Sequence, residues 1–263
     1  MNRAWTIPQS LHWSAPQEAQ KPGDRKVPYH VRFRDRFAAM IEAGTLAAGS
    51  KLPPERALAE EFSITRVTVR QALTRMEAEG LIFREQRRGW FVSPPRVRYD
   101  PTANTSFTES MTRQGRVAGT SVLSKQQVAA SHWESSRLGC AVGDPIFVIN
   151  RLRTVDGRAV LVEQIYIKAK RCPDLLDYPL DQSLTDLMAE KFGIIEHRAQ
   201  INMHPTALTG VPAKALGVAA GTPSLYLSRT ILDQSNEVVE LDQEFWRHDA
   251  IDISVLAAGS LNV

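Results

Sequence analysis

The apolar positions between Leu52 and Val92 predict two short helices, a tight turn and a β-hairpin. In the second helix, apolar residues recur at the i, i+3, i+4, i+7 spacing of one buried helical face: Val69, Ala72, Leu73 and Met76. Thr65 is suited to cap the start of this helix, and Gly80 is suited to end it. Two short β-prone runs follow Gly80. This order is typical of a helix-turn-helix with a hairpin wing, whose second helix lies in the major groove of DNA.

The exposed face of the second helix and the tip of the hairpin carry side chains that can bind DNA. An arginine can donate to guanine O6 and N7 together, worth ~1–3 kcal/mol of discrimination, and a threonine can contact a phosphate or a thymine methyl group. The alternative is a set of solvated arginines on an exposed helix. Because the residues occur together on this pattern, we expect the following to contact DNA: Thr65, Arg66, Thr68, Arg70, Arg87 and Arg88.

Four spaced motifs in this region resemble the GntR family of bacterial transcription regulators. They are Leu52-Pro53-Pro54-Glu55-Arg56, Thr65-Arg66-Val67-Thr68-Val69-Arg70, Glu77-Ala78-Glu79-Gly80-Leu81 and Gly89-Trp90-Phe91-Val92. The resemblance covers Pro28–Val92. It implies that Arg56, Arg66 and Arg70 contact the operator, and that the wing tip up to Gly89 does so too.

Three positions depart from the GntR pattern. Pro54 stands where a serine cap is usual, Arg87 where a wing glycine is common, and Trp90 where the family has a threonine. Proline suits an early helix position, so we expect the first change to be tolerated. Arg87 makes the wing more basic and leaves its turn conformation open.

Composition and charge indicate two domains with different roles. A chain of 263 residues with 43% hydrophobic and 23% charged residues suits two globular domains. Residues 28–99 contain 13 Lys/Arg and 8 Asp/Glu, whereas residues 100–263 contain 15 and 19. The net charge of +3 therefore hides a basic segment followed by an acidic one. A DNA-binding domain joined to a domain with another role has this asymmetry.

The rest of the sequence indicates where the domains begin and end. We expect a disordered tail over residues 1–26, the winged helix-turn-helix domain over residues 27–93 and a linker over residues 94–105. No signal peptide opens the chain and no apolar run reaches the ~18 residues of a membrane span, so we expect a cytoplasmic protein without membrane contact. Cys140 and Cys172 fit no zinc spacing, and we expect neither a metal nor a cofactor.

An internal duplication organises the second half. Leu138-Gly139, Gly143, Pro145 and Arg151 recur at identical spacing as Leu216-Gly217, Gly221, Pro223 and Arg229. Each copy predicts a short helix, a Gly-x-Pro turn and two strands: Ile146–Val155 with Ala159–Ile167, and Leu225–Leu232 with Val238–Trp246. A helix over Ser183–Phe192 and a strand over Ile194–Ala207 lie between the copies. The predicted fold class is α+β, with helices flanking an antiparallel sheet.

This half is similar to the UTRA effector domain of the HutC subfamily, whose fold resembles chorismate lyase, over residues 106–258. The motifs are Ser106-Phe107-Thr108-Glu109-Ser110-Met111, Gln114-Gly115, Arg151-x-Arg153, Ser183-Leu184 and Trp246-Arg247-His248-Asp249. Regulators of 2-aminoethylphosphonate utilisation look closer still, through Arg87–Val92, Asp100–Thr105 and Phe245–Asp249. The resemblance implies an effector pocket lined by Thr108, Arg151, Arg153, Glu163, Ser183, Glu240 and Trp246.

The chemistry of these residues suggests a ligand with two charged ends. Arg151 and Arg153 project from one face of a strand, and a phosphate or phosphonate that bridges them relieves their repulsion. Glu163 shares this face if the Asp156-Gly157 turn has an odd-numbered loop, and lies on the other face if the loop has two residues. With the UTRA resemblance we expect Thr108 and Ser183 at the anion-binding end.

The resemblance also implies an acidic end formed by Glu163 and Glu240, with Asp242 as a further candidate. Trp246, where a tyrosine is frequent, offers an aromatic face to a cation. The alternative is that Arg153 and Glu163 form one cross-strand ion pair on a solvated face, typically worth under ~1 kcal/mol.

We therefore expect a ligand-responsive transcriptional regulator of a catabolic operon, which binds a palindromic double-stranded DNA operator as a homodimer. Its expected effector is a small anion or zwitterion, with 2-aminoethylphosphonate favoured. One alternative is a GntR/HutC-type repressor that senses a sugar phosphate or another small metabolite. Another is a chorismate-lyase-like enzyme, although residues 106–263 show no nucleophile–base pair, metal cluster or cofactor loop.

Overall fold

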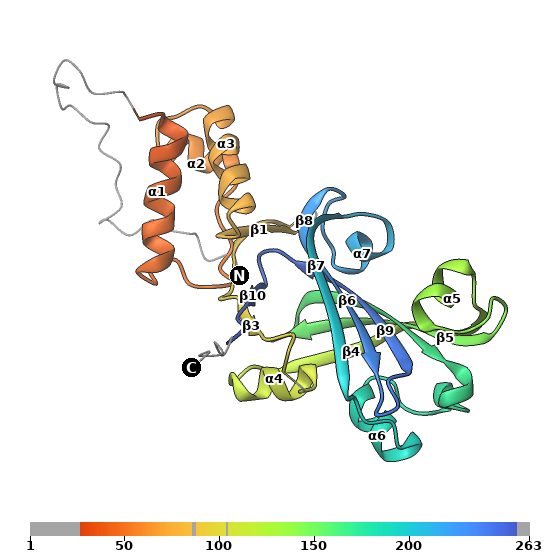
Figure 1. Cartoon of the computed structure of the whole chain (residues 1–263). Helices are drawn as coiled ribbons and strands as arrows, with labels where there is room; N and C mark the ends of the chain where they lie inside the picture. Colours follow the sequence, from red (N-terminus) through yellow and green to blue (C-terminus); the bar gives the residue numbers. More distant parts are fainter. Residues whose placement is uncertain (1–26, 86–87, 104, 257–263) are drawn as a thin grey trace, which may run out of the picture. The chain divides into compact units, whose positions relative to one another are not determined.

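The computed structural model describes residues 27–85, 88–103 and 105–256, and the chain divides into two compact units, residues 1–95 and 96–263 (Figure 1). The tail expected over residues 1–26 lies outside the described residues. Each unit has a hydrophobic core of its own. Among the described helices, none is long and apolar enough to cross a membrane.

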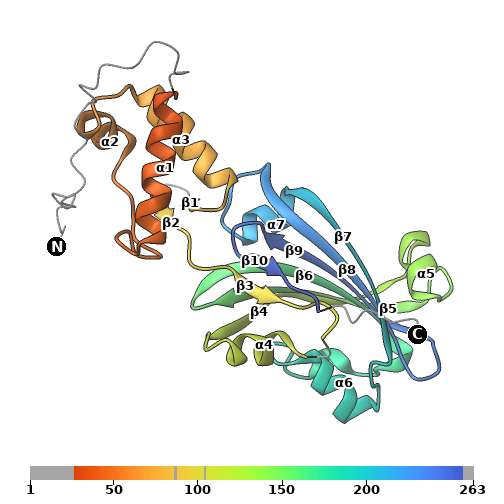
Figure 2. The same cartoon turned by 60° about the vertical axis from the view of Figure 1, so that its left-hand side comes forward.

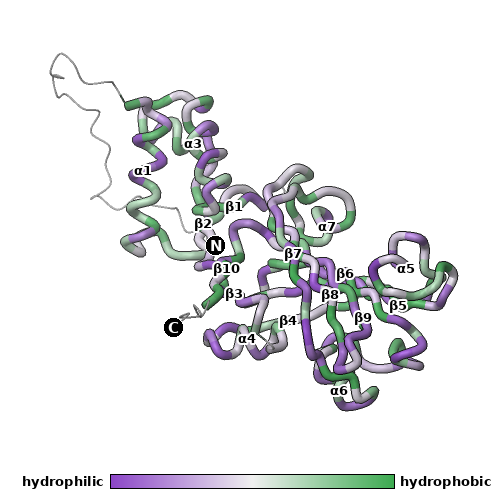
Figure 3. The backbone as a smooth tube through the Cα atoms, in the orientation of Figure 1, coloured by the Kyte–Doolittle hydropathy of each residue, from purple (hydrophilic) through white to green (hydrophobic). Residues whose placement is uncertain are grey.

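The N-terminal unit packs three helices against a two-stranded hairpin. Its elements are α1 (Tyr29–Glu42), α2 (Glu55–Glu61), α3 (Arg66–Ala78), β1 (Ile82–Glu85) and β2 (Gly89–Val92). Hydrophobic and hydrophilic residues alternate along α1 and α3 (Figure 3). The rings of Phe33, Phe37 and Phe62 pack with centroids 4.4–5.7 Å apart and join α1 to the end of α2. The predicted winged helix-turn-helix is confirmed.

The N-cap residues of α3 and α2 differ in how they start their helices. The side-chain oxygen of Thr65 accepts a hydrogen bond from the backbone N–H of Thr68 at 3.1 Å, as predicted. Pro54 occupies the N-cap of α2 without a side-chain hydrogen bond, so this departure from the family is accommodated. Trp90 is only 8% exposed and packs into the core of the unit, which gives its large ring a structural role.

The C-terminal unit is built on a six-stranded antiparallel sheet of order β4-β5-β6-β9-β8-β7. Its strands are β4 (Ala118–Ala129), β5 (Pro145–Val155), β6 (Arg158–Lys168), β7 (Arg198–Leu208), β8 (Thr222–Leu232) and β9 (Val238–Arg247). The duplication gives the two halves β4-β5-β6 and β7-β8-β9, which meet where β6 pairs with β9. The predicted α+β class is confirmed, and β4 is an additional strand.

Helices cover both faces of this sheet. They are α4 (Phe107–Arg113), α5 (His132–Leu138), α6 (Leu184–Phe192) and α7 (Gly210–Ala215). Figure 2 shows α4 and α6 on one side and α7 on the other. Met111 of α4 and Met188 of α6 pack on side chains of one face, whereas Leu138 of α5 and Ala213 of α7 pack on the other. The face under α4 and α6 carries the charged residues discussed below.

The segment expected to be a linker, residues 94–105, instead contains a strand. β3 (Val97–Tyr99) pairs in parallel with β10 (Ile251–Ile253) near the end of the described chain. Val97 and Tyr99 are buried on either side of exposed Arg98, and this short alternation is a strand pattern that the neighbouring prolines obscure. Three residues of the expected linker thus form a strand of the C-terminal unit.

Candidate functional site

The α3 helix presents the predicted DNA-contacting side chains to solvent. Arg66 and Arg70 are exposed, and the hydroxyls of Thr65 and Thr68 hydrogen-bond each other at 2.9 Å. Arg70 donates from Nε and Nη2 to Glu55 Oε2 of α2 at 3.2 and 2.9 Å, and this hydrogen bond raises the pKa of Arg70. The side chain of Arg70 is 63% exposed, so water screens this pair and a DNA phosphate or base can replace Glu55.

The remaining DNA candidates lie on α2 and on the wing. The side chain of Arg56 is 80% exposed, with Glu60 Oε1 3.7 Å from its Nε. Arg88 pairs with Glu85 and lies 5.3 Å from the ring centroid of Phe91, and Gly89 begins β2 with a φ of +104°. Arg87 lies outside the described residues. These side chains can place positive charge against DNA without breaking a buried contact.

Val67 is a further surface residue of α3 that the sequence analysis did not single out. It is 66% exposed, although valine is most often buried, and it lies between Arg66 and Thr68 in the first turn. An exposed apolar side chain at such a position can contact a thymine methyl group.

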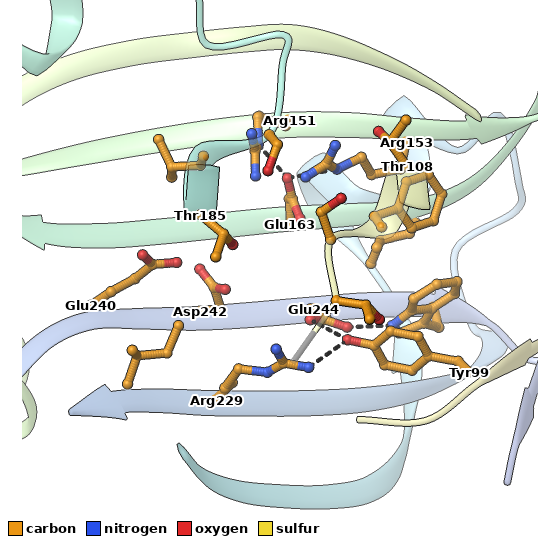
Figure 4. Close-up of a pocket in the computed structure, with 18 residues that line it drawn as sticks. Tyr99, Thr108, Arg151, Arg153, Glu163, Thr185, Arg229, Glu240, Asp242 and Glu244 are labelled. Carbon is orange, nitrogen blue, oxygen red and sulfur yellow. Dashed lines mark hydrogen bonds and ion pairs between the residues drawn. The ribbon is translucent and has the colours of Figure 1, made fainter. Parts of the chain in front are cut away.

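The C-terminal unit contains a pocket on the sheet face under α4 and α6 (Figure 4). Its floor consists of β5, β6, β9 and β8, and its rim includes the starts of α4 and α6. All seven residues that the UTRA resemblance implied line it: Thr108, Arg151, Arg153, Glu163, Ser183, Glu240 and Trp246. The structure thus brings together side chains that are up to 138 residues apart in sequence.

Glu163 reaches the pocket because of a β-bulge. Asp156 and Gly157 form a two-residue turn with φ of +50° and +79°, which alone would put Glu163 on the opposite face. The register then shifts between Arg153 and Thr154, leaving Val160 without a partner on β5. This extra residue places Glu163 directly opposite Arg151.

The arginine end of the pocket is already partly neutralised. Arg153 donates from Nε to Glu163 Oε1 at 2.9 Å and from Nη1 to Thr120 Oγ1 at 2.6 Å, and Arg151 forms an ion pair with the same carboxylate oxygen. Burial alone would raise the pKa of Glu163, but the two guanidinium groups outweigh it and lower that pKa. The cross-strand ion pair of Arg153 and Glu163, which was the alternative to a pocket, does form, but it is buried inside the pocket rather than on a solvated face.

One prediction about this end needs correction. Glu163 bridges Arg151 and Arg153 and therefore belongs to the arginine end, not to the acidic end. Ser183 lines the pocket; its hydroxyl oxygen accepts a hydrogen bond from the backbone N–H of Asp186 at 3.2 Å and caps α6, and its O–H can still donate to an anion. The side chain of Arg151 also donates from Nη1 to the carbonyl oxygens of Leu180 and Gln182, which holds the chain that leads into α6.

The acidic end consists of Glu240, Asp242 and Glu244, which share one face of β9. In Figure 4 the carboxyl groups of Glu240 and Asp242 point toward each other near Thr185. Burial raises the pKa of Glu240 to about 7, and burial together with the charge of Glu240 raises that of Asp242 well above its usual value. Burial also raises the pKa of Glu244. A cation in the pocket would favour the ionised form of this pair.

Sequence reasoning missed several residues of the pocket, among them Glu244 of the acidic end, Arg229 and Tyr99. Arg229 on β8 lies directly opposite Asp242, and Tyr99 is contributed by β3. The duplication carried a signal for Arg229, because it stands at the position of Arg151 in the second copy. No pattern in the sequence pointed to Tyr99.

A winged helix-turn-helix joined to a separate sheet domain indicates a DNA-binding regulator. Comparison with known families agrees, because residues 32–92 match the bacterial regulatory proteins of the gntR family and residues 113–252 match the UTRA domain. The chain belongs to the GntR family, in its UTRA-containing, HutC-type group.

Individual relatives cover nearly the whole chain. The HTH-type transcriptional repressor NagR of Bacillus subtilis strain 168 is 30% identical over 223 residues, which are 85% of this chain and 92% of NagR. A probable fructoselysine utilization operon transcriptional repressor of Escherichia coli K12 is 25% identical over 229 residues, 86% of this chain and 93% of the repressor. The crystal structure of PhnF from Mycobacterium smegmatis has a TM-score of 0.61 at 29% identity, covering 86% of this chain and 99% of PhnF. The family consists of transcriptional regulators, so the protein is not an enzyme.

Proposed function

We propose that this regulator senses a small zwitterion that joins a phosphonate or phosphate group to an ammonium group, and that 2-aminoethylphosphonate is its effector. In this proposal two protomers form a homodimer that binds a palindromic operator. The observation that carries the ligand class is the polarity of the pocket, with Arg151 and Arg153 at one end and Glu240 and Asp242 at the other.

Charge supports an anion at the first end. Arg151, Arg153 and Glu163 together carry one net positive charge, because a single carboxylate bridges two guanidinium groups. Thr108 adds a hydroxyl to this part of the pocket. An oxyanion there gains charge-assisted hydrogen bonds, which are roughly twice as strong as neutral ones.

Size supports a small ligand. The pocket has a cavity volume of about 60 Å³, and one water needs roughly 10–15 Å³ by the same measure. The space therefore suits a ligand of a few non-hydrogen atoms, and a larger one requires the pocket to widen. The aromatic side chain of Trp246 also lines the pocket, where it can contact a methylene group.

The acidic end also favours a second candidate, a sugar phosphate. Because burial keeps the Glu240–Asp242 pair partly protonated near neutral pH, it can both donate to and accept from sugar hydroxyl groups. In this case the phosphate binds at the same arginine end.

Calorimetric titration separates the two candidates. Wild-type protein is titrated with 2-aminoethylphosphonate, inorganic phosphate and glucosamine 6-phosphate. The proposal predicts saturable binding of the phosphonate, and its loss in Arg153→Gln. The control is Arg171→Gln, because Arg171 pairs with Asp233 and Glu237 and does not line the pocket. If only glucosamine 6-phosphate binds, the effector is a sugar phosphate and not 2-aminoethylphosphonate. If none of the three compounds binds, the proposed class of ligand is refuted.

A further inference from the structure

Arg229 is the pocket arginine that the structure leaves without a carboxylate partner. Within the described residues it forms no ion pair, whereas Arg151 and Arg153 both pair with Glu163. Its Nη2 donates to the hydroxyl of Tyr99 at 2.8 Å and to the carbonyl oxygen of Pro101 at 3.1 Å. Its buried Nε has no hydrogen-bond partner. The hydrogen bonds of Arg229 are therefore to neutral oxygens, whereas the carboxyl groups of Glu244 and Asp242 act on its charge without direct contact.

The internal duplication shows that this arrangement is a departure from symmetry. Arg151 lies opposite Glu163 on β6, and Arg229 lies opposite Asp242 on β9. The first arginine turns toward its opposite carboxylate. In Figure 4 the second extends along the pocket toward Tyr99 instead.

The partners of Arg229 belong to the stretch of chain that follows the boundary between the two units. Tyr99 is the fourth residue of the C-terminal unit and the last residue of β3, and Pro101 is two residues further. The Tyr99 hydroxyl donates in turn to Glu244 Oε1 at 3.3 Å, and Trp246 Nε1 donates to Glu244 Oε2 at 2.6 Å. A continuous set of hydrogen bonds thus runs from Trp246 on the pocket wall to the chain that leads out of the N-terminal unit.

We infer that Arg229 couples occupation of the pocket to this stretch of chain, by holding Tyr99 and Pro101 more tightly when a cationic group binds Glu240 and Asp242. Asp242 lies directly opposite Arg229 and, in its ionised form, competes with Tyr99 and Pro101 for the guanidinium group. An ammonium group that binds Asp242 occupies the oxygens of this carboxylate, so Arg229 keeps its hydrogen bonds to Tyr99 and Pro101. The effector then prefers one state of the segment, as coupling requires.

Two variants test this inference in two experiments, one without ligand and one with it. Only the experiment with ligand rests on the proposed zwitterion. Arg229→Gln removes the charge, and Tyr99→Phe removes only the hydroxyl. The control, Tyr226→Phe, removes a hydroxyl that accepts from Gln243 and does not line the pocket. In the first arm, without ligand, hydrogen–deuterium exchange of residues 97–101 should be faster in both variants and unchanged in the control. If both variants exchange at the wild-type rate, Arg229 does not hold this segment and the inference is overturned.

The second arm measures coupling with 2-aminoethylphosphonate as the probe. Calorimetry first establishes whether the wild-type protein binds it; absence of binding refutes the proposed effector and this ligand arm with it, whatever the first arm shows. Given binding, the effector should slow exchange of residues 97–101 in the wild type and change operator affinity by a factor of about 5–150. In Tyr99→Phe, at effector concentrations that calorimetry shows to saturate the variant, that factor should fall to about one. If the effector changes the operator affinity of Tyr99→Phe as much as that of the wild type, the coupling role is overturned, while 2-aminoethylphosphonate remains the effector.

Discussion

Glu163 lies directly opposite Arg151 and bridges it to Arg153, although the two-residue turn of the hairpin alone would place Glu163 on the other face of the sheet. The bulge at Val160 supplies the missing residue. The structure thus uses a local irregularity to place a counter-ion between two buried arginines, which would otherwise repel each other in a medium of low dielectric constant.

Glu163→Gln should destabilise the protein while making the pocket more receptive to anions. Removing one partner of a buried ion pair costs ~3–5 kcal/mol, because the remaining charges stay desolvated. Urea denaturation measures this loss. Added phosphate should stabilise the variant more than the wild type, because it can replace the missing carboxylate.

The matched control for this change is Glu237→Gln, whose side chain is 63% exposed and pairs with Arg171. We expect it to lower the free energy of unfolding by less than ~1 kcal/mol. Equal losses in the two variants would show that the Glu163 bridge has no special role in stability.

The carboxyl group of Glu240 should make stability fall as the pH rises. Its pKa is raised by burial to about 7 in the folded protein, against 4.5 as its reference value. Between these values the unfolded chain has released the proton and the folded protein has not, so folding becomes less favourable as pH increases. Glu240→Gln removes this effect.

Urea denaturation at several pH values checks the prediction. Below pH 4.5 the free energy of unfolding should depend on pH in the same way in the wild type and in Glu240→Gln. By pH 8 the free energy of unfolding of the variant should have risen by ~1–3 kcal/mol relative to that of the wild type. Glu190→Gln, on the exposed side of α6, is the control and should run parallel to the wild type. If the stability of Glu240→Gln and that of the wild type change with pH in parallel, Glu240 does not titrate with a raised pKa in the folded protein.

Much of the fold could be predicted from sequence because local patterns determine it. The spacing of apolar residues identified α3, and the duplication identified both hairpins of the sheet. β4 was missed because it is an edge strand whose side chains are mostly exposed, so its hydrophobic alternation is weak. β3 was missed because three residues between prolines carry little periodicity.

The candidate site was predictable only in part, because it depends on register and on long-range packing. The family resemblance implied residues that do line one pocket, whereas Glu163 was assigned to the wrong end, since no turn rule reveals the bulge at Val160. Tyr99 enters the pocket through a parallel pairing of β3 with β10, which are separated by about 150 residues. Local sequence contains no information on that pairing.

Arg66→Ala and Arg70→Ala should each weaken specific operator binding by ~1–3 kcal/mol, because each removes a guanidinium group from the exposed face of α3. Fluorescence anisotropy with an operator obtained by in vitro selection measures the loss. Effector binding, measured by calorimetry, should be unchanged. Arg113→Ala, which removes an exposed arginine of α4, should leave both functions intact. Loss of both functions in Arg66→Ala would indicate misfolding.

The most direct test of the account is the operator affinity of wild-type protein and Arg151→Ala, measured by anisotropy with and without 2-aminoethylphosphonate. The account predicts that the effector changes the affinity of the wild-type protein by about fivefold or more, and that Arg151→Ala binds the operator but does not respond. A response of wild-type size in Arg151→Ala would contradict the arginine end as the anion site. Unchanged affinity of the wild-type protein would contradict 2-aminoethylphosphonate as the effector.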